Sequence, residues 1–430
     1  MRTLAPSLCA LSIGTVAVLL AGCGSSQPPI ATPGAMPQSA AQQSLSASLS
    51  GRYKVLYSFK DGYKDGYRPA ADLTNVNGTL YGTTEAGGGR CGYPYHSCGA
   101  VFAITRFGKE RILHRFYGQP DGAVPAAKLL SVNGTLYGTT QAGGASNNGT
   151  VFTVTASGVE RVIYSFQGYP GDGQRPNGLI NVNGTLYGTT ALGGYYGFGT
   201  VFKVTLSGKE RVLHNFTQAY IDGAQPVGNL VYVDGTFYGA TEFGGAYCNV
   251  NSYGGCGAVY KITRAGAERV IYSFRGKNKD DAQYPQAGLT LMNGVFYGTS
   301  TIGGNTKCRY GQGIGCGVVF AVTTSGAERI IYRFGGAPDG QQPVATLTAV
   351  NGSLYGTTLY GGTGCGYSAQ GCGTVFKVTT SGVEQLFHSF DSQPDGADPA
   401  AGLTVVAHGL YGTTSLGGSS RSGTVFRISP

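Results

Sequence analysis

The sequence predicts an all-β fold, a seven-bladed β-propeller of four-stranded antiparallel blades, and three observations support this. The tetrapeptide Tyr-Gly-Thr/Ala-Thr/Ser occurs seven times at spacings of 50 to 59 residues, and a period of this length indicates a repeat architecture. Each copy contains four short segments rich in β-forming residues. The repeat region begins with a fourth strand and ends with a copy that lacks one, so the two ends together make a complete blade. The seven copies begin at Tyr81, Tyr137, Tyr187, Tyr238, Tyr297, Tyr355 and Tyr411.

One repeat, residues 173–216, illustrates the four strands. Gly178–Val182 is a short apolar strand, and Asn183-Gly184 is a strong hairpin signal because a type I′ turn needs positive φ at both residues. Thr185–Thr190 returns, Gly199–Thr205 is the third strand, and Glu210–Phe216 is the fourth. Apolar residues occur on both faces of these strands, which favours sheets stacked face to face.

The ends of the chain predict the number of blades. Residues 54–59 form a fourth strand that precedes any first strand, and the last copy stops after a third strand, Gly423–Ile428. Joining the N-terminal strand to the C-terminal three strands completes a seventh blade. It also removes two open sheet edges, which otherwise promote aggregation.

The N-terminal segment predicts export and lipid anchoring. Residues 1–22 resemble a signal peptide, with Arg2 before an apolar run, and Leu20-Ala21-Gly22-Cys23 resembles a bacterial lipobox in which Cys23 is acylated. Residues 23–51 read as the acylated Cys and a flexible tether, and 52–430 as the propeller. We expect a protein anchored to the bacterial outer membrane. An ordinary signal peptide or a short membrane helix are the alternatives.

Composition narrows the range of partners. The net charge is +9, but no run of five basic residues occurs, so nucleic-acid binding is not predicted. No catalytic, phosphate-binding or dinucleotide motif is evident. We expect no cofactor, no metal and a monomer.

The repeat resembles the GloVer-type tandem-repeat proteins of bacterial surfaces. The family pattern occurs here as Asn133-Gly134, Leu136–Thr140, Gly143-Gly144 and Gly149–Phe152. The resemblance covers about residues 53–430. There are small departures: Ala407-His408 replaces one Asn-Gly, and Asp281-Ala282 replaces one Asp-Gly. The resemblance implies repeats and varied surface anchors, and no particular activity.

Eight cysteines form four local pairs, each in the loop between second and third strands. Loops with a pair have 10 to 12 residues between the Gly-Gly and the next strand, and loops without one have four. We predict disulfides, because closing such loops restricts the unfolded chain and an exported protein meets an oxidising compartment. Metal sites would favour Cys-x2-Cys spacing with nearby His. The pairs are Cys91/Cys98, Cys248/Cys256, Cys308/Cys316 and Cys365/Cys372.

Alignment of the repeats assigns several chemically suggestive residues to the scaffold. One Asp per blade, from Asp65 to Asp395, precedes a turn; a cation site at the axis is the alternative to an Asx turn. His114, His214 and His388 occupy the slot that Tyr fills in the other four blades, which indicates packing. Glu-Arg pairs such as Glu110-Arg111 begin the outermost strand, where charges protect an edge.

The residues that differ between blades are the candidate site. In a propeller, successive connections between strands alternate between the two faces of the ring. The loops with predicted disulfides, here called stapled loops, therefore share one face with the linkers between blades. Binding residues are often found on loops that a rigid scaffold holds. Tyr and Arg there would suit a glycan or a protein partner. We predict a non-catalytic binding module; a polysaccharide lyase and a ligand-free envelope scaffold are the alternatives. The candidate residues are Arg68, Arg90, Tyr93, Tyr95, His96, Arg175, Tyr195, Tyr196, Tyr247, Tyr253, Arg309, Tyr310, Tyr360 and Tyr367.

Overall fold

In the computed structural model the repeats form short antiparallel β-strands. The described residues are 53–60, 65–89, 91, 97–217, 222–248, 254–276, 279–304, 308–310, 313–365, 368 and 370–429, and they fall within the unit Ala47–Pro430. No α-helix occurs among them. None of their segments is therefore a helix that could cross a membrane. The predicted signal peptide, tether and Cys23 lie outside the described residues.

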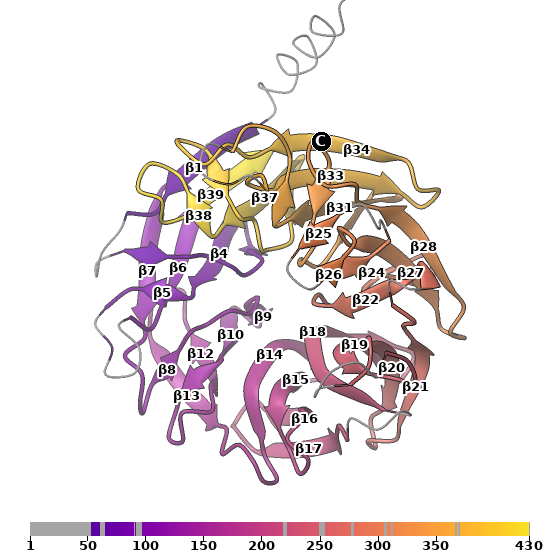
Figure 1. The fold of residues 1–430 in the computed structure, drawn as a ribbon. Coiled ribbons are helices and arrows are strands. Elements are labelled where there is room, and N and C mark those ends of the chain that lie inside the picture. The colour runs from indigo at the N-terminus through magenta and orange to yellow at the C-terminus, as the bar shows by residue number, and fades with distance from the viewer. Residues whose placement is uncertain are drawn as a thin grey trace, which may run out of the picture. The chain divides into compact units, whose positions relative to one another are not determined.

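Seven antiparallel sheets follow one another around a ring (Figure 1), which confirms the seven-bladed β-propeller. Blades 1 and 2 comprise β3 (Thr74–Val76), β4 (Thr79–Thr84), β6 (Ala100–Thr105) and β7 (Glu110–Arg115), then β9 (Leu130–Val132), β10 (Thr135–Thr140), β12 (Thr150–Val154) and β13 (Glu160–Ser165). Blades 3 and 4 comprise β14 (Gly173–Val182), β15 (Thr185–Gly193), β16 (Thr200–Thr205) and β17 (Glu210–Asn215), then β18 (Gly223–Val233), β19 (Thr236–Gly244), β20 (Ala258–Thr263) and β21 (Glu268–Ser273).

The remaining blades follow the same order. Blade 5 comprises β22 (Ala282–Pro285), β23 (Thr290–Met292), β24 (Val295–Gly303), β27 (Val318–Thr323) and β28 (Glu328–Arg333). Blade 6 comprises β30 (Thr348–Val350), β31 (Ser353–Thr358), β33 (Thr374–Thr379) and β34 (Glu384–Ser389). Blade 7 comprises β36 (Thr404–Val406), β37 (Gly409–Thr414), β39 (Thr424–Ile428) and β1 (Tyr53–Ser58).

The ring closes as the sequence predicts. The N-terminal strand β1 pairs antiparallel with the C-terminal strand β39, from Tyr53 opposite Ile428 to Ser58 opposite Thr424, and Figure 1 shows the two side by side. Residues from all seven blades surround a central cavity of about 230 Å³. The N-terminal strand is therefore the fourth strand of blade 7.

Packing explains the repeated Tyr-Gly-Thr-Thr. Its glycine faces the aromatic side chain of the third strand; a Cβ on Gly188 would lie 2.8 Å from the Phe202 ring. The last threonine of the motif, Thr190, lies opposite Thr200; its hydroxyl donates to the Leu192 carbonyl and contacts the Thr200 hydroxyl. Its neighbour reaches the next blade, as in Thr139, which donates to the carbonyl of Asn177. The motif thus packs the blade and joins it to the next.

Aromatic rings continue the core from blade to blade. The Phe that follows the fourth strand meets the third-strand aromatic of the next blade edge to face, as in Phe166 and Phe202 at 5.0 Å between ring centroids. The same contact joins blade 6 to blade 7 through Phe390 and Phe426, at 5.3 Å. Edge-to-face rings contribute about 0.5–1.5 kcal/mol of stability beyond the area they bury. The same apolar contact therefore stabilises every seam, as we call the interface between two consecutive blades.

The two faces of the ring differ, as predicted. The Asn-Gly turns are of the I′ kind, since Asn183 and Gly184 both have positive φ, 52° and 79°. These turns and the turns between third and fourth strands form one face, here called the turn face. The long loops and the linkers form the other, here called the loop face.

One predicted strand boundary was wrong. The strand predicted as Thr185–Thr190 continues to Gly193, the first residue of the Gly-Gly, which pairs with Gly173 of the preceding linker. In blades 3 and 4 this pairing extends the first two strands. In blade 5 it extends the second strand, where Gly303 of β24 pairs with Ala282 of β22. In the other four blades it forms separate two-stranded sheets: β2 (Gly66–Tyr67) with β5 (Ala86–Gly87), β8 (Gly122–Ala123) with β11 (Ala142–Gly143), β29 (Gly340–Gln341) with β32 (Tyr360–Gly361), and β35 (Gly396–Ala397) with β38 (Leu416–Gly417).

Candidate functional site: the loop face

The loops of the candidate face are stapled at their base. All four predicted disulfides form: Cys91–Cys98, Cys248–Cys256, Cys308–Cys316 and Cys365–Cys372, with Cα–Cα separations of 5.3 to 5.7 Å. The second cysteine of each pair is buried. Its carbonyl accepts a backbone N–H from the next linker, as Cys256 does from Tyr284 at 3.0 Å. The staples therefore fix the loops to the ring, and they indicate an oxidising, extracytoplasmic compartment.

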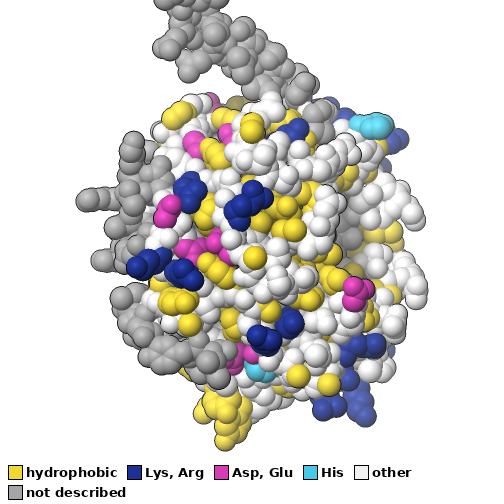
Figure 2. All heavy atoms as spheres, turned by 90° about the vertical axis from the view of Figure 1, so that its right-hand side faces the viewer, with side chains coloured by type: hydrophobic (Ala, Val, Ile, Leu, Met, Phe, Trp, Pro, Cys, Tyr) yellow, Lys and Arg dark blue, Asp and Glu magenta, His cyan; other side chains and the backbone are white. Residues whose placement is uncertain are grey.

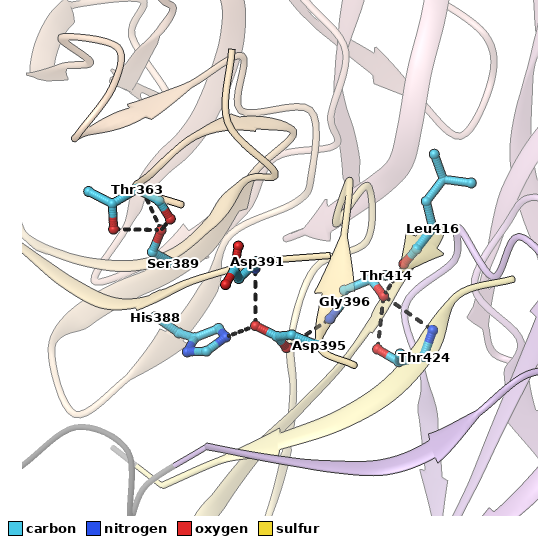
Figure 3. Close-up of polar contacts among 9 residues, drawn as sticks. All are labelled: Thr363, His388, Ser389, Asp391, Asp395, Gly396, Thr414, Leu416 and Thr424. Atoms are coloured by element: carbon cyan, nitrogen blue, oxygen red, sulfur yellow. Dashed lines mark hydrogen bonds and ion pairs between the residues drawn. The ribbon is translucent and has the colours of Figure 1, made fainter. Parts of the chain in front are cut away.

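The repeated Asp residues anchor the linkers to the outermost strands. The Asp172 carboxylate accepts the Tyr164 hydroxyl at 2.7 Å and the N–H groups of Gln167 and Gly173 at 2.7 and 2.6 Å. Figure 3 shows the equivalent Asp395, which meets His388 and the N–H groups of Asp391 and Gly396. These carboxylates bind the outer strands, so they do not form a site at the axis.

Histidine replaces Tyr at three seams, as the repeat alignment predicts. Nε2 lies 3.2 Å from the Asp carboxylate for His114 and Asp121, 3.4 Å for His214 and Asp222, and 2.8 Å for His388 and Asp395. Burial alone would raise the pKa of Asp222, but the interaction with the nearby His214 lowers that pKa overall.

The glutamates at the start of the fourth strands are not edge charges, so that prediction was wrong for them. Each lies against the Asp of the preceding seam with a buried Oε1 that has no hydrogen-bond partner among the described residues. Burial, then the charge of Asp172, raises the pKa of Glu210 to about 7. The arginines that follow are exposed, as expected; Arg111 donates to the Ala156 carbonyl of the next blade.

Exposed tyrosines gather on the loop face. Tyr195 and Tyr196 are 65% and 51% exposed, with their rings edge to face at 5.0 Å. Tyr117 and Tyr169, on linkers, were not predicted as site residues and are also exposed. The exposed aromatic side chains among the described residues are these four, Tyr247 on the same face, and Phe107 on the turn face.

A basic pocket adjoins one of these tyrosines. The Arg275 guanidinium lies over the Tyr247 ring, 5.5 Å from its centroid, and Lys279 lines the same hollow of about 570 Å³. The neighbouring Asp280 is engaged by both donors of Arg333, at 3.1 and 2.8 Å. Arg275 and Lys279 were missed, although their linker is the longest of the seven: Asp281 follows Phe274 by seven residues.

The two predicted linker arginines have an unusual backbone. Arg68 and Arg175 have φ of 58° and 55°, and the residue before the linker proline has positive φ in all seven seams. Arg175 and Arg68 are both exposed, and Arg68 Nε lies 4.0 Å from Glu85 Oε2. Tyr360, in β32, is half-buried. The structure does not gather the predicted residues into one pocket; they are spread over several blades.

Several predicted residues have no described side chain. Arg309 and Tyr310 form the short strand β25 (Arg309–Tyr310), paired with β26 (Gly313–Ile314), and only their backbone is described. The others lie outside the described residues: Arg90, Tyr93, Tyr95, His96, Tyr253 and Tyr367.

Charges on the rim are mixed. Figure 2 shows the side of the ring that carries β21 and β28, where Lys and Arg occur singly or in small groups with Asp, Glu and hydrophobic side chains between them. Neither sign of charge therefore dominates this side of the ring.

The fold and its stapled loop face define a disulfide-bonded seven-bladed β-propeller built from tandem repeats. The chain belongs to the Gloeobacter/Verrucomicrobia repeat family, whose model matches residues 92–313 and 250–430. No curated protein matches the chain.

Three solved structures are similar to the chain at low sequence identity, each with a TM-score below 0.5. A chain of the S. cerevisiae Dbp5 complex with Nup159, Gle1, IP6 and ADP has 11% identity and a TM-score of 0.46, covering 88% of this chain and 95% of that one. A Mycobacterium tuberculosis puromycin-hydrolyzing peptidase has 12% identity and a TM-score of 0.46, covering 87% of this chain and 54% of that one. Trypanosoma rangeli sialidase has 10% identity and a TM-score of 0.40, covering 86% of this chain and 55% of that one.

Proposed function

We propose that the protein is a non-catalytic binding module that holds an anionic glycan against its loop face, outside the cytoplasm. The observation that carries the proposal is the exposed Tyr247 in a pocket with two cations, Arg275 and Lys279, on a face that presents four further exposed tyrosines. Tyrosine offers a flat apolar surface for a sugar ring and a hydroxyl for its polar groups. A cation beside that ring adds attraction for carboxylate or sulfate groups.

The Tyr247 pocket is the proposed centre of recognition. Arg275 and Tyr247 are already in contact, so a sugar ring would meet a surface that loses little freedom on binding. Asp280 is paired with Arg333 and does not neutralise Lys279. Tyr195 and Tyr196, one blade earlier, would contact further units of a longer chain.

Lipid anchoring at Cys23 completes the proposed function. One acyl-bearing terminus and the tether of residues 23–51 would hold the propeller at the outer membrane while leaving the loop face accessible. Metabolic labelling with a fatty acid tests this anchor. We expect label on the wild type and none on a Cys23→Ser variant, and unlabelled wild-type protein would contradict the proposal.

A glycan array that contains uronic-acid and sulfated polymers tests binding by the purified full chain. We expect selective retention on anionic glycans and at least about tenfold weaker binding for Tyr247→Ala and for Lys279→Ala. Phe107→Ala is the matched control, because Phe107 is also exposed with an arginine, Arg106, 5.0 Å from its ring centroid, but lies on the turn face. Equal losses in all three variants, or no retention, would contradict the proposed site.

The same polymers distinguish a binding module from a lyase. A lyase leaves an unsaturated product that absorbs in the ultraviolet, so incubation with uronic-acid polymers reports catalysis directly. We expect no rise in absorbance with any polymer that the array retains. A steady rise would replace the proposed function by an enzymatic one.

A further inference from the structure

Two of the seven seams between blades bring a histidine and two carboxylates together. At the seam of blades 1 and 2 these are His114, Asp121 and Glu160, and at the seam of blades 3 and 4 they are His214, Asp222 and Glu268. One ligand atom from each residue lies within 4.8 Å of the other two. The three residues come from the fourth strand of one blade, the following linker and the fourth strand of the next blade.

We propose that each of these two seams binds a divalent transition-metal ion, with Zn²⁺ as the reference ion. An imidazole nitrogen and two carboxylate oxygens form a donor set suited to Zn²⁺ in proteins, and a water completes four-coordination. The inference is independent of the loop face, because these seams lie on the outer strands.

The His–Asp distances fit two ligands of one ion, and His114 and Asp121 are also within hydrogen-bond distance of each other. Zn–N and Zn–O bonds of about 2.0–2.2 Å place two ligands of one tetrahedral ion about 3.3 Å apart. The His–Asp separations at these two seams are 3.2 and 3.4 Å. A charge-assisted hydrogen bond is shorter, about 2.7–2.9 Å.

The third histidine seam supplies an internal comparison. At the seam of blades 6 and 7, Tyr53 occupies the position of the glutamate, and its ring stacks on His388 with 3.7 Å between centroids. There the His388–Asp395 distance is 2.8 Å, that of an ordinary strong hydrogen bond. The His–Asp distance is therefore longer at the two seams that have a Glu beside the Asp than at the seam that has Tyr53 in its place.

Unsatisfied polar atoms are the second observation. Among the described residues, His214 Nε2 and the Oε1 atoms of Glu160 and Glu268 are buried without a hydrogen-bond partner. Buried polar atoms are normally paired, so such a group calls for an explanation. Within the described part of the chain, the Oε1 atoms are also unpartnered at seams with Tyr, for example in Glu210, so the histidine is what distinguishes these two seams. At the seam of blades 2 and 3 the Tyr164 hydroxyl contacts both Asp172 and Glu210, at 2.7 and 3.4 Å. A histidine nitrogen with a free lone pair offers no such hydrogen, whereas a cation satisfies all three groups.

The side chains at both seams are largely buried. His114 and Asp121 are each 18% exposed, and His214 and Asp222 are 19% and 7% exposed. A cation among such largely desolvated groups would interact strongly with both carboxylates.

Reciprocal substitutions at matched seams test the proposal on untagged full chain that has been stripped with a chelator. Titration calorimetry with Zn²⁺ at neutral pH should give two sites in the wild type, one in His214→Tyr and none in His114→Tyr/His214→Tyr. Tyr164→His should add a site, since it creates the same donor set with Asp172 and Glu210. His408→Tyr, at an exposed turn, is the control and should retain two sites.

Co²⁺ absorption provides a second measurement, because a histidine with a purely structural role would give no such signal. We expect visible d–d absorption from Co²⁺ in the wild type and its loss in the double variant, with the metal-free melting temperature preserved because Tyr is the native residue at four other seams. Absence of Zn²⁺ heat and Co²⁺ absorption in the wild type would overturn the proposal and leave a His–Asp ion pair. Binding that persists undiminished in the double variant would overturn it equally.

Discussion

The ring of Pro226 packs directly against the α-carbon of Gly199 in the preceding blade. A Cβ placed on Gly199 would lie 2.6 Å from Pro226 Cδ and would also collide with the Thr190 carbonyl. The same proline–glycine contact recurs at every seam, including Pro69 with Gly423 where the ring closes. The glycine that opens each third strand is thus required by a neighbouring blade, and not only by its own backbone.

Gly199→Ala should destabilise the propeller by about 3 kcal/mol or more, because the methyl group has no space and φ is +100°. Gly184→Ala is the matched control: φ is +79°, but nothing lies within 4 Å of the added carbon, so only the left-handed strain of about 1–2 kcal/mol applies. Denaturant unfolding measures both. Equal losses would show that the proline contact contributes nothing.

Asp172→Asn should lower the free energy of unfolding by about 2 kcal/mol, because the amide nitrogen cannot accept the N–H or O–H donors that face the carboxylate. Asp234→Asn, an identical change at an exposed hairpin turn, should stay within about 0.5 kcal/mol. Thermal and denaturant unfolding of the pair measure the difference. A loss at Asp234 as large as that at Asp172 would mean that charge alone is responsible.

The sequence predicted those features of the fold that depend on neighbouring residues or on the pairing of strand edges. Asn183-Gly184 predicts its turn because both residues must adopt positive φ. The N-terminal strand predicts how the ring closes, because it is a fourth strand without a blade of its own and its edge needs a partner. The Gly193 pairing was missed, since its partner Gly173 lies 20 residues earlier in a linker that carries no strand signal. Strand ends are set by such tertiary pairing.

The burial of the glutamates escaped prediction for a similar reason. Glu210 begins an outermost strand, and only the neighbouring blade, through Tyr164 and Asp172, covers it. The repeat alignment identified which residues share a role, but it contained no information on contacts between blades. Arg275 and Lys279 could have been found by comparing linker lengths as the loop lengths were compared.

Removing one staple should weaken the protein measurably. A Cys248→Ser/Cys256→Ser variant loses the restriction that a short closed loop places on the unfolded chain, about 2–3 kcal/mol. The comparison of wild type with and without reductant should give a larger loss, since four bridges open together. Unfolding curves measure both changes, and a double variant as stable as the oxidised wild type would contradict the entropic role.

Stability should fall as pH rises from about 4.5 through 7. Burial, followed by the charge of the facing Asp, raises the pKa of Glu110, Glu210, Glu328 and Glu384 to about 7 from an ordinary value of 4.5. Below that ordinary value both folded and unfolded chains hold the proton. Between the two values only the folded chain holds it, so stability decreases with pH and levels off above the folded pKa.

Glu210→Gln isolates one of these seams. The neutral amide remains uncharged at every pH, so the variant should lose less stability than the wild type between pH 5 and pH 8, by roughly 1 kcal/mol after solvent screening of a half-buried group. Asp234→Asn removes one charge at an exposed turn and should leave the wild-type slope unchanged. Unfolding at several pH values in constant ionic strength measures the slopes. If Glu210→Gln and the wild type lose the same stability over this range, the carboxyl pairs at the seams do not control the pH dependence, and the facing Asp–Glu contacts must be relieved in another way.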